Sequence, residues 1–340
     1  MTYDTQLLPL NEESVLMAAE LFRQGELVAF PTETVYGLGA NALDTRAVPR
    51  IFSAKNRPMD NPLIVHIWDM DQLKDLCEPS ENALKLMEAF WPGPLTVLCR
   101  KKAAVPDAVT AGLATVGVRM PSHPGCRAML RACRLPIAAP SANLSGRPSP
   151  TQAKHVLEDM RGRIPLILDG GDCEVGLEST VLDASGPVPM ILRPGAVTRE
   201  MVSAVCGDCL VADSVMRPLR DGEQAPSPGM KHKHYAPRGK LTLYRGSVEN
   251  VSRMIRQAYD ASENAVILAL DSHIPYYGDR TVMGMGDTLE DAAHSLFALL
   301  RQADERGYEH LFAETVTEQA VGLAVMNRLA RAAGFDIVEV

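Results

Sequence analysis

The segment ELVAFPTETVYGLG, residues 26–39, indicates the fold class of this chain. Its first part, Glu26–Phe30, is a short apolar run typical of a buried strand. Pro31 ends that strand, because proline has no N–H to donate to a strand ladder. A helix is predicted just before it, since Asn11 is a good N-cap and apolar residues follow at helical spacing. Strands and helices that alternate in this way predict a mixed α/β domain.

The same alternation continues to about residue 205, with Pro- and Gly-marked turns between the elements. The further predicted strands are Leu63–Ile67, Leu95–Arg100, Gly117–Arg119, Ile137–Ala139, Leu166–Asp169, Thr180–Asp183 and Met190–Arg193. The further predicted helices are Ile51–Lys55, Met70–Leu76, Glu81–Phe90, Gly125–Cys133, Thr151–Met160 and Arg199–Val205.

A change of composition divides the chain. Residues 217–230 hold three prolines and two glycines with few apolar side chains, which is typical of a linker. We therefore expect a first domain at 1–206, a linker at 207–238 and a second domain at 239–340. In the second domain, strands such as Ala265–Leu270 alternate with long helices, which predicts a parallel sheet in a Rossmann-like α/β/α arrangement.

Composition excludes several classes of protein. Of the 340 residues, 46% are apolar and 22% charged, as in ordinary globular proteins and unlike disordered or collagen-like chains. The longest apolar runs fall far short of the ~20 residues that a membrane helix needs. Met1–Leu10 has no basic, apolar leader, so we expect no signal peptide and a cytoplasmic location. With 34 basic and 42 acidic residues, the net charge of −8 argues against strong direct binding of nucleic acid.

The seven cysteines also suit a reducing compartment. Most show no regular spacing, so reduced and mostly buried thiols are the simplest interpretation. Cys206 and Cys209 form a lone CxxC, and His232 with His234 are the nearest further ligands for a zinc site. We expect no metal ligation by protein side chains.

Two cations follow one another at the end of a predicted helix. Lys55 and Arg57 are two residues apart, so an extended backbone would turn both side chains the same way. Converging cations suit a phosphate or carboxylate ligand. Alternatively, the pair stabilises the C-terminal end of the helix through its dipole.

Further polar residues stand in or after apolar strands. His66 suits either a satisfied core position or a ligand site, whereas Arg119 needs an anionic partner, a ligand or a carboxylate side chain. Ser141 and Asn143 follow a strand of small residues, which leaves room for a bulky ligand or marks an ordinary turn. The hydroxyls and glycines of residues 31–39 suit a close approach to a ligand, or form a tight turn with ordinary Thr caps. With no recognisable nucleophile–base pair, the residues favour phosphoryl or nucleotidyl transfer by positioning and charge neutralisation.

The usual phosphate-binding motif GxxxxGK[ST] is missing from the sequence. Another set of motifs, in chain order, resembles the YrdC/Sua5 family of threonylcarbamoyl-AMP synthases: PTETVYGLG, KNRPMDNPLIVHI, FWPGPLTV, VGVRMP, APSANLSGRPSPT, LESTVLD and ILRPG. The motif SPGMKHKHYAP and the α/β segment after it resemble the two-domain Sua5 form.

This resemblance implies a fold and a reaction. The fold would be an N-terminal YrdC-like twisted mixed sheet, with helices around an open cleft, followed by a C-terminal Rossmann-like α/β/α domain. The reaction would be that of a nucleotidyltransferase that converts L-threonine, bicarbonate and ATP into threonylcarbamoyl-AMP and pyrophosphate. The product would pass to a threonylcarbamoyl-transfer machinery that makes t6A at position 37 of tRNA. Mg²⁺ would be carried on the ATP phosphates.

The resemblance also implies roles for individual residues. The KxR and SxN signatures, expected to be catalytic, are Lys55, Arg57, Ser141 and Asn143. Contacts to ATP are expected from Arg57, Asn61, Thr115, Ser141, Ser149, Arg193 and the linker residues His234 and Tyr235. The threonine pocket is expected to be lined by Thr34, His66, Arg119, Ala139 and Ser179. Many members have Gly or Asp between the two cations, where this chain has Asn56.

Two other functions stay open from the sequence. A transferase of the same fold could make a carbamoyl-adenylate for another acceptor, as in hydrogenase maturation, but those chains are much longer and carry zinc-finger modules. An RNA-binding module is a different class, and the net charge of −8 argues against it.

Overall fold

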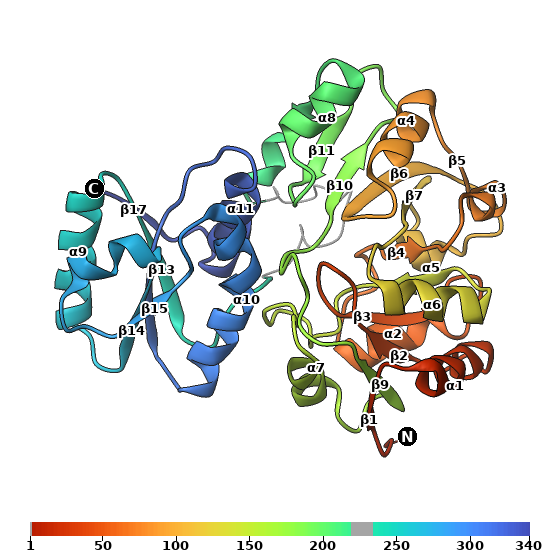
Figure 1. Cartoon of the computed structure of the whole chain (residues 1–340), viewed down its shortest axis with the longest axis horizontal. Helices are drawn as coiled ribbons and strands as arrows, with labels where there is room; N and C mark the ends of the chain where they lie inside the picture. The colour runs from red at the N-terminus through yellow and green to blue at the C-terminus, as the bar shows by residue number, and fades with distance from the viewer. Residues whose placement is uncertain (1, 219–233) are drawn as a thin grey trace.

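The computed structural model describes residues 2–218 and 234–340. Figure 1 shows two groups of elements, one running from the N-terminus to α8 and the other from β13 to the C-terminus. Each group is built on its own sheet, as the sequence predicts, and the sheets hold 12 and five strands among the described residues.

The first sheet is mixed and runs in the order β1-β9-β2-β3-β8-β4-β7-β6-β10-β11-β12, with β5 paired to β6. It contains parallel pairs such as β4·β7 and antiparallel pairs such as β6·β7. Its strands are β1 (Gln6–Pro9), β2 (Val28–Phe30), β3 (Gly37–Asn41), β4 (Ile64–His66), β5 (Cys77–Glu78), β6 (Leu95–Lys101), β7 (Thr115–Arg119), β8 (Ile137–Ala139), β9 (Leu166–Asp169), β10 (Thr180–Asp183), β11 (Met190–Arg193) and β12 (Leu210–Val211).

Helices pack around this sheet. They are α1 (Glu12–Arg23), α2 (Val48–Lys55), η1 (Met70–Gln72), α3 (Leu73–Leu76), α4 (Glu81–Phe90), α5 (Asp107–Thr110), α6 (Pro124–Cys133), α7 (Ala153–Met160), α8 (Arg199–Cys206) and η2 (Asp213–Val215). In α1, Asn11 caps the helix through Ser14, as predicted, and the apolar face is buried. Large buried clusters lie between the helices and the sheet.

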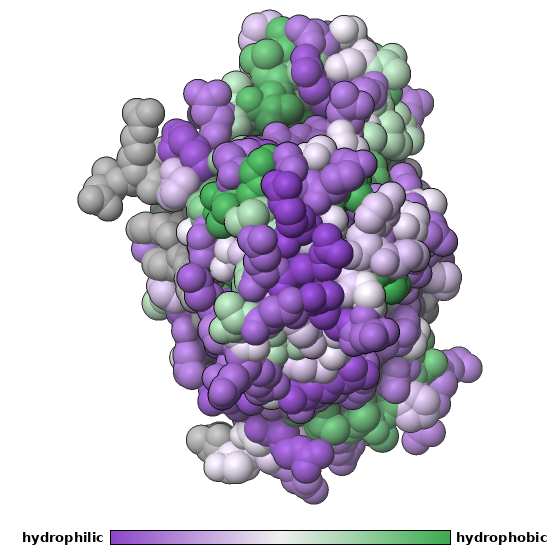
Figure 2. All heavy atoms as spheres, turned by 90° about the vertical axis from the view of Figure 1, so that its left-hand side faces the viewer, coloured by the Kyte–Doolittle hydropathy of each residue, from purple (hydrophilic) through white to green (hydrophobic). Residues whose placement is uncertain are grey.

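The second sheet is parallel throughout its described pairs, in the order β15-β14-β16-β13-β17. Its elements are β13 (Lys240–Arg245), α9 (Val248–Asp260), β14 (Ala265–Ala269), η3 (Asp271–Tyr277), β15 (Val282–Gly284), α10 (Leu289–Glu305), β16 (His310–Glu314), α11 (Gly322–Ala332) and β17 (Ile337–Glu339). The predicted Rossmann-like arrangement is confirmed. On the face shown in Figure 2, hydrophilic residues predominate and apolar ones form small separate patches.

Five strands of the described residues are absent from the predictions. They are β1, β3, β5, β12 and β15. Of these, β12 lies inside the expected linker, where it pairs in parallel with β11. Strand propensity does not predict β3, because Gly37 and Gly39 both disfavour a strand. A Cβ on Gly39 would lie 2.7 Å from atoms of both Ile137 and Phe30, so this glycine serves close packing and not the expected approach to a ligand. Residues 219–233 of the expected linker lie outside the described residues.

Candidate functional site

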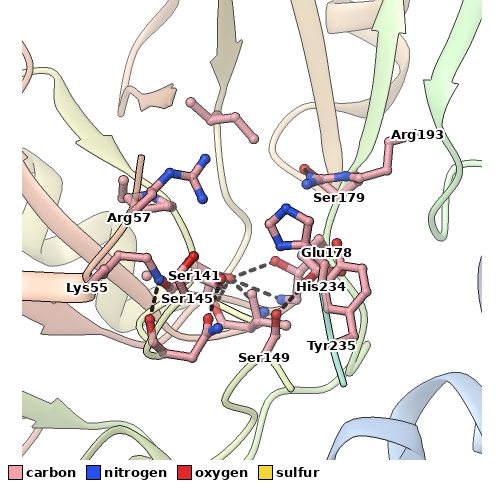
Figure 3. A pocket seen from close by; sticks show the side chains of 18 of the residues that line it. Lys55, Arg57, Ser141, Ser145, Ser149, Glu178, Ser179, Arg193, His234 and Tyr235 are labelled. Atoms are coloured by element: carbon pink, nitrogen blue, oxygen red, sulfur yellow. Dashed lines mark hydrogen bonds between the residues drawn. The ribbon is translucent and has the colours of Figure 1, made fainter. Parts of the chain in front are cut away.

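A cavity opens where strand ends of the first sheet meet residues 234 and 235. Figure 3 shows Lys55 and Arg57 on one side of the cavity and Ser179 and Arg193 on the other, with His234 and Tyr235 nearby. The lining residues are Thr32, Thr34, Val35, Gly37, Lys55, Arg57, Ile64, His66, Arg119, Ala139, Pro140, Ser141, Asn143, Ser145, Gly146, Ser149, Glu178, Ser179, Arg193, His234 and Tyr235.

Most of the predicted site residues converge on this cavity. It is lined by Thr34, Lys55, Arg57, His66, Arg119, Ala139, Ser141, Asn143, Ser149, Ser179, Arg193, His234 and Tyr235. Asn61 and Thr115 are not among the lining residues. Asn61 is buried, and its carbonyl accepts a hydrogen bond from Arg57 at 3.3 Å. Thr115 begins β7 and lines a separate, smaller cavity.

Lys55 holds together the loop that follows β8. Its ammonium is buried and donates to the carbonyl oxygens of Ser141 and Asn143, the latter at 2.5 Å. Burial and the nearby Arg57 lower the pKa of Lys55 well below its usual value. The Ser141 hydroxyl donates in turn to Asn143 Oδ1 at 2.5 Å. Hydrogen bonds therefore join Lys55 of the KxR signature to Ser141 and Asn143 of the SxN signature.

The backbone between the two cations differs from the expected extended chain. Lys55 is the last residue of α2, and Asn56 has φ 52°, in the left-handed region. Glycine and asparagine tolerate this conformation best, which explains why this position accepts Asn without a chemical role. Beyond the turn, Arg57 donates to the carbonyls of Asn61 and Pro62, and burial lowers its pKa to about 10, so it stays charged.

Arg119 has a carboxylate partner within the protein. Its Nη2 lies 2.8 Å from Glu33 Oε1, both side chains are 4% exposed, and its Nη1 donates to Thr34 Oγ1 at 2.9 Å. Burial alone would raise the pKa of Glu33, but the charge and hydrogen bonds of Arg119 outweigh it, so that this pKa is lowered. Of the two partners that the sequence left open for Arg119, the structure supplies the carboxylate side chain.

His66 is buried at the end of β4 and carries no charge at neutral pH. Burial and the nearby Arg119 lower its pKa to about 3. Its Nδ1 lies 3.2 Å from the Ile64 carbonyl and 3.3 Å from the Ile137 carbonyl. Because both oxygens can only accept, Nδ1 must carry the proton, which leaves the lone pair on Nε2. His66 therefore offers the cavity an acceptor.

The opposite wall joins β10 and β11. Arg193 Nε and Nη2 both donate to the Ser179 carbonyl, at 3.1 and 3.0 Å, and Nη2 reaches the Ser179 hydroxyl at 3.2 Å. That hydroxyl lies 2.8 Å from Thr96 Oγ1. Burial lowers the pKa of Arg193 to about 10, so this side of the cavity also stays cationic.

The sequence argument missed two acidic residues of the site, Glu33 and Glu178. Glu178 lines the cavity and accepts a hydrogen bond from Ser149 at 2.5 Å. Both residues stand inside motifs quoted for the resemblance, PTETVYGLG and LESTVLD. The need of Arg119 for an anionic partner was the one signal that pointed to Glu33.

Residues 2–218 and 234–340 contain no group of three or more His, Cys, Asp or Glu that could hold a metal ion. His232, a ligand considered for the CxxC pair, lies outside them; all seven cysteines are free, and only Cys206 is not buried. No helix in these parts is long and apolar enough to cross a membrane.

Comparison with known proteins places this geometry in a family. The Sua5/YciO/YrdC family model, described as "Telomere recombination", matches residues 20–195. The model described as "Threonylcarbamoyl-AMP synthase, C-terminal domain" matches residues 197–334. The chain belongs to the Sua5 family. Its sequence is 46% identical to the threonylcarbamoyl-AMP synthase of Bacillus subtilis, over 98% of this chain and 97% of that one.

Solved structures of the Sua5 family agree over the whole chain. Sua5 of P. abyssi in complex with L-threonine has a TM-score of 0.92 and 43% identity, covering 100% of both chains. A double-alanine variant of the same protein has a TM-score of 0.93 and 42% identity, covering 99% of this chain and 98% of that one. The likeness includes both sheets, so the fold expected from the motifs is confirmed.

Proposed function

We propose that this chain is an ATP-dependent L-threonylcarbamoyladenylate synthase, a nucleotidyltransferase that serves tRNA t6A formation. The observation that carries the proposal is the convergence of residues from seven separate motifs on one cavity with cations on both sides. The full-length likeness to threonylcarbamoyl-AMP synthases supports the same reaction. We expect it to act in the cytoplasm and to deliver its product to a threonylcarbamoyl-transfer machinery.

L-Threonine is proposed to bind beside Arg119, Thr34, His66, Ala139 and Ser179. A guanidinium carries five N–H donors, and Arg119 uses three toward Gly93, Thr34 and Glu33, which leaves donors for the threonine carboxylate. The threonine amine must lose its proton before it can add to CO2, which bicarbonate supplies with the loss of water. A neutral His66 with its lone pair on Nε2 can accept a hydrogen bond from this amine.

ATP is proposed to lie between the Arg57 and Arg193 sides of the cavity, with contacts from Ser141, Ser149, His234 and Tyr235. In the reaction, a carbamate oxygen attacks the α-phosphorus, a P–O bond forms there, and the bond to the β-phosphate oxygen breaks to release pyrophosphate. The guanidinium groups of Arg57 and Arg193 would offset the charge that develops on the phosphates. Removal of one such donor typically costs ~10²–10³ in rate. Asn61 and Thr115 stay part of the proposed ATP site, although neither lines the cavity.

Mg²⁺ fits this proposal as part of the ATP complex. Glu178 is the only carboxylate among the described lining residues, and it is already ion-paired. Phosphate oxygens and water would therefore supply the ligands of Mg²⁺, which would add charge neutralisation at the triphosphate.

The test is pyrophosphate release from ATP with threonine and bicarbonate supplied together or singly. We expect release only when both are present. The rival reaction, carbamoyl-adenylate formation for another acceptor, predicts turnover that does not depend on threonine. Release that ignores threonine would therefore contradict the proposal.

A further inference from the structure

One arginine of the second group of elements is bonded to residues beside the cavity. Arg328 lies on α11 and is fully buried, although it is one of the longest charged side chains in the protein. Burial of a charge is costly unless it is paired and hydrogen-bonded. The groups that pair with the Arg328 guanidinium therefore indicate the role of this residue.

Apart from its neighbour Asn327, those partners lie next to strands of the first sheet. Arg328 Nε donates to Glu178 Oε2 at 2.8 Å, its Nη2 donates to the Glu178 carbonyl at 3.3 Å, and its Nη1 donates to the Pro194 carbonyl at 2.9 Å. Glu178 stands two residues before β10, and Pro194 directly follows Arg193 at the end of β11. Because β10 and β11 are antiparallel, the start of one lies beside the end of the other. Arg328 therefore binds both segments at one edge of the cavity.

Glu178 faces the cavity on its other side. Its Oε1 accepts from the Ser149 hydroxyl, and the residue is only 6% exposed. Burial raises the pKa of Glu178, but the charges of Arg328 and Arg193 outweigh it, so that the carboxylate stays ionised. A buried negative charge beside a triphosphate repels the ligand unless a cation of the protein balances it.

Arg328 also supports Tyr235. Its guanidinium carbon lies 5.7 Å from the centre of the Tyr235 ring, within the range of a cation–π contact. The ring also packs against Phe297 of α10, with 5.1 Å between ring centres. Tyr235 thus contacts two helices of the second group while it lines the cavity.

From these contacts we infer that Arg328 is a positioning residue for ATP: it neutralises Glu178, fixes the Pro194 segment and supports Tyr235. The inference rests on the proposed function, because that function supplies ATP as the anionic ligand. It gives the second domain a specific part in the site, since the first domain alone leaves Glu178 without this counter-ion.

The test is ATP affinity, measured by calorimetry on the full chain without turnover. Arg328→Met is expected to raise the Kd for ATP about tenfold or more, because it leaves the carboxylate of Glu178 unbalanced. The double variant Glu178→Gln/Arg328→Met removes both charges and is expected to lower the Kd at least about threefold from that of Arg328→Met, while the lost contacts to the Pro194 carbonyl and Tyr235 keep it above that of the original protein.

Arg301 provides the matched control. It is an equally buried arginine of α10, and it bridges the two groups of elements through Asp159 at 2.8 Å and the Pro148 carbonyl. Arg301→Met removes a comparable ion pair. Adding Glu178→Gln to that variant is not expected to lower its Kd for ATP. His294→Ala, which removes one exposed contact to the Glu174 carbonyl at 2.9 Å, is expected to bind ATP like the original protein.

Unchanged ATP affinity in Arg328→Met, or no recovery in the double variant, would overturn the inference alone. If the original protein binds no ATP, the proposed function falls and this inference falls with it. If Arg328→Met yields no folded protein, Arg328→Lys replaces it, with Arg301→Lys as its control. A lysine keeps the charge but cannot span Glu178 and Pro194, so an ATP Kd equal to that of the control would again overturn the inference.

Discussion

At the residue scale, the chemistry of the cavity depends on how each charge is balanced. Arg119 is paired with Glu33, Arg193 is held by the Ser179 carbonyl, and Lys55 is enclosed by two carbonyls. The sequence allowed Arg119 to be found because a charged side chain in an apolar strand is conspicuous, and Lys55 because it precedes Arg57 at the end of a helix. It did not allow their partners to be found, because those lie far away in the chain.

Substitution of Arg119 tests the proposed threonine subsite. Arg119→Ala is expected to weaken threonine binding by roughly 10²-fold or more while ATP binding changes by less than about threefold, since a charge-assisted pair to a carboxylate is lost. The measurement is the Kd of each ligand by calorimetry. Because Glu33 would be left buried and unpaired, Glu33→Gln/Arg119→Ala serves as the control for folding. Equal loss of both ligands would show that Arg119 is misassigned.

Asn56 tests the left-handed turn between the two cations. Asn56→Gly is expected to leave activity and stability nearly unchanged, because glycine adopts positive φ freely. Asn56→Val is expected to cost about 1–2 kcal/mol of stability and to lower activity, because it strains the turn that sets Lys55 and Arg57. Urea denaturation and pyrophosphate release measure the two effects. If valine were as well tolerated as glycine, the turn would not govern the site.

At the scale of elements, periodicity and end signals predicted most helices and strands. α1 begins at its predicted cap, and Ile137–Ala139 forms β8 with the predicted bounds. The failures have a common physical reason, which is that tertiary packing decided the structure. β3 is rich in glycine, and β12 is a two-residue edge strand inside a segment that otherwise resembles a linker.

Gly39→Ala tests the packing that permits β3. The new methyl group would lie 2.7 Å from side-chain atoms of Ile137 and Phe30, so we expect a loss of about 1–3 kcal/mol in the free energy of unfolding. Chemical denaturation measures it. Gly186→Ala is the control, since its nearest neighbour would be 3.8 Å away, and it should be nearly neutral. If Gly39→Ala left the free energy of unfolding unchanged, β3 would have room for the added methyl group.

At the scale of the whole molecule, the motifs predicted one cavity and two α/β units, but not how the units are joined. The Arg328–Glu178 contact spans 150 residues of sequence, and the Arg301–Asp159 contact spans 142. Pairs so far apart leave no local pattern, and neither arginine differs from an exposed helical arginine in its sequence context. The net charge of −8 likewise gave no sign of a cavity lined by cations.

Stability of the whole molecule is expected to fall in mild acid. Burial lowers the pKa values of His66 and His155 to about 3, whereas both are near 6.5 in the unfolded chain. Below pH 6.5 the unfolded state therefore binds more protons than the folded state, and each histidine removes up to about 1.4 kcal/mol of stability per pH unit. Urea denaturation between pH 7.5 and 5 measures the slope. His155→Gln should reduce it, and an unchanged slope in that variant would contradict the assignment.

The most direct test of the central claim is the identity of the product. The protein is incubated with ATP, L-threonine and ¹³C-bicarbonate, and the nucleotides are separated and weighed by mass spectrometry. We predict an adenylate that carries both threonine and the heavy carbon, formed in step with pyrophosphate and lost when threonine is omitted. An adenylate without threonine, or without the heavy carbon, would contradict the account.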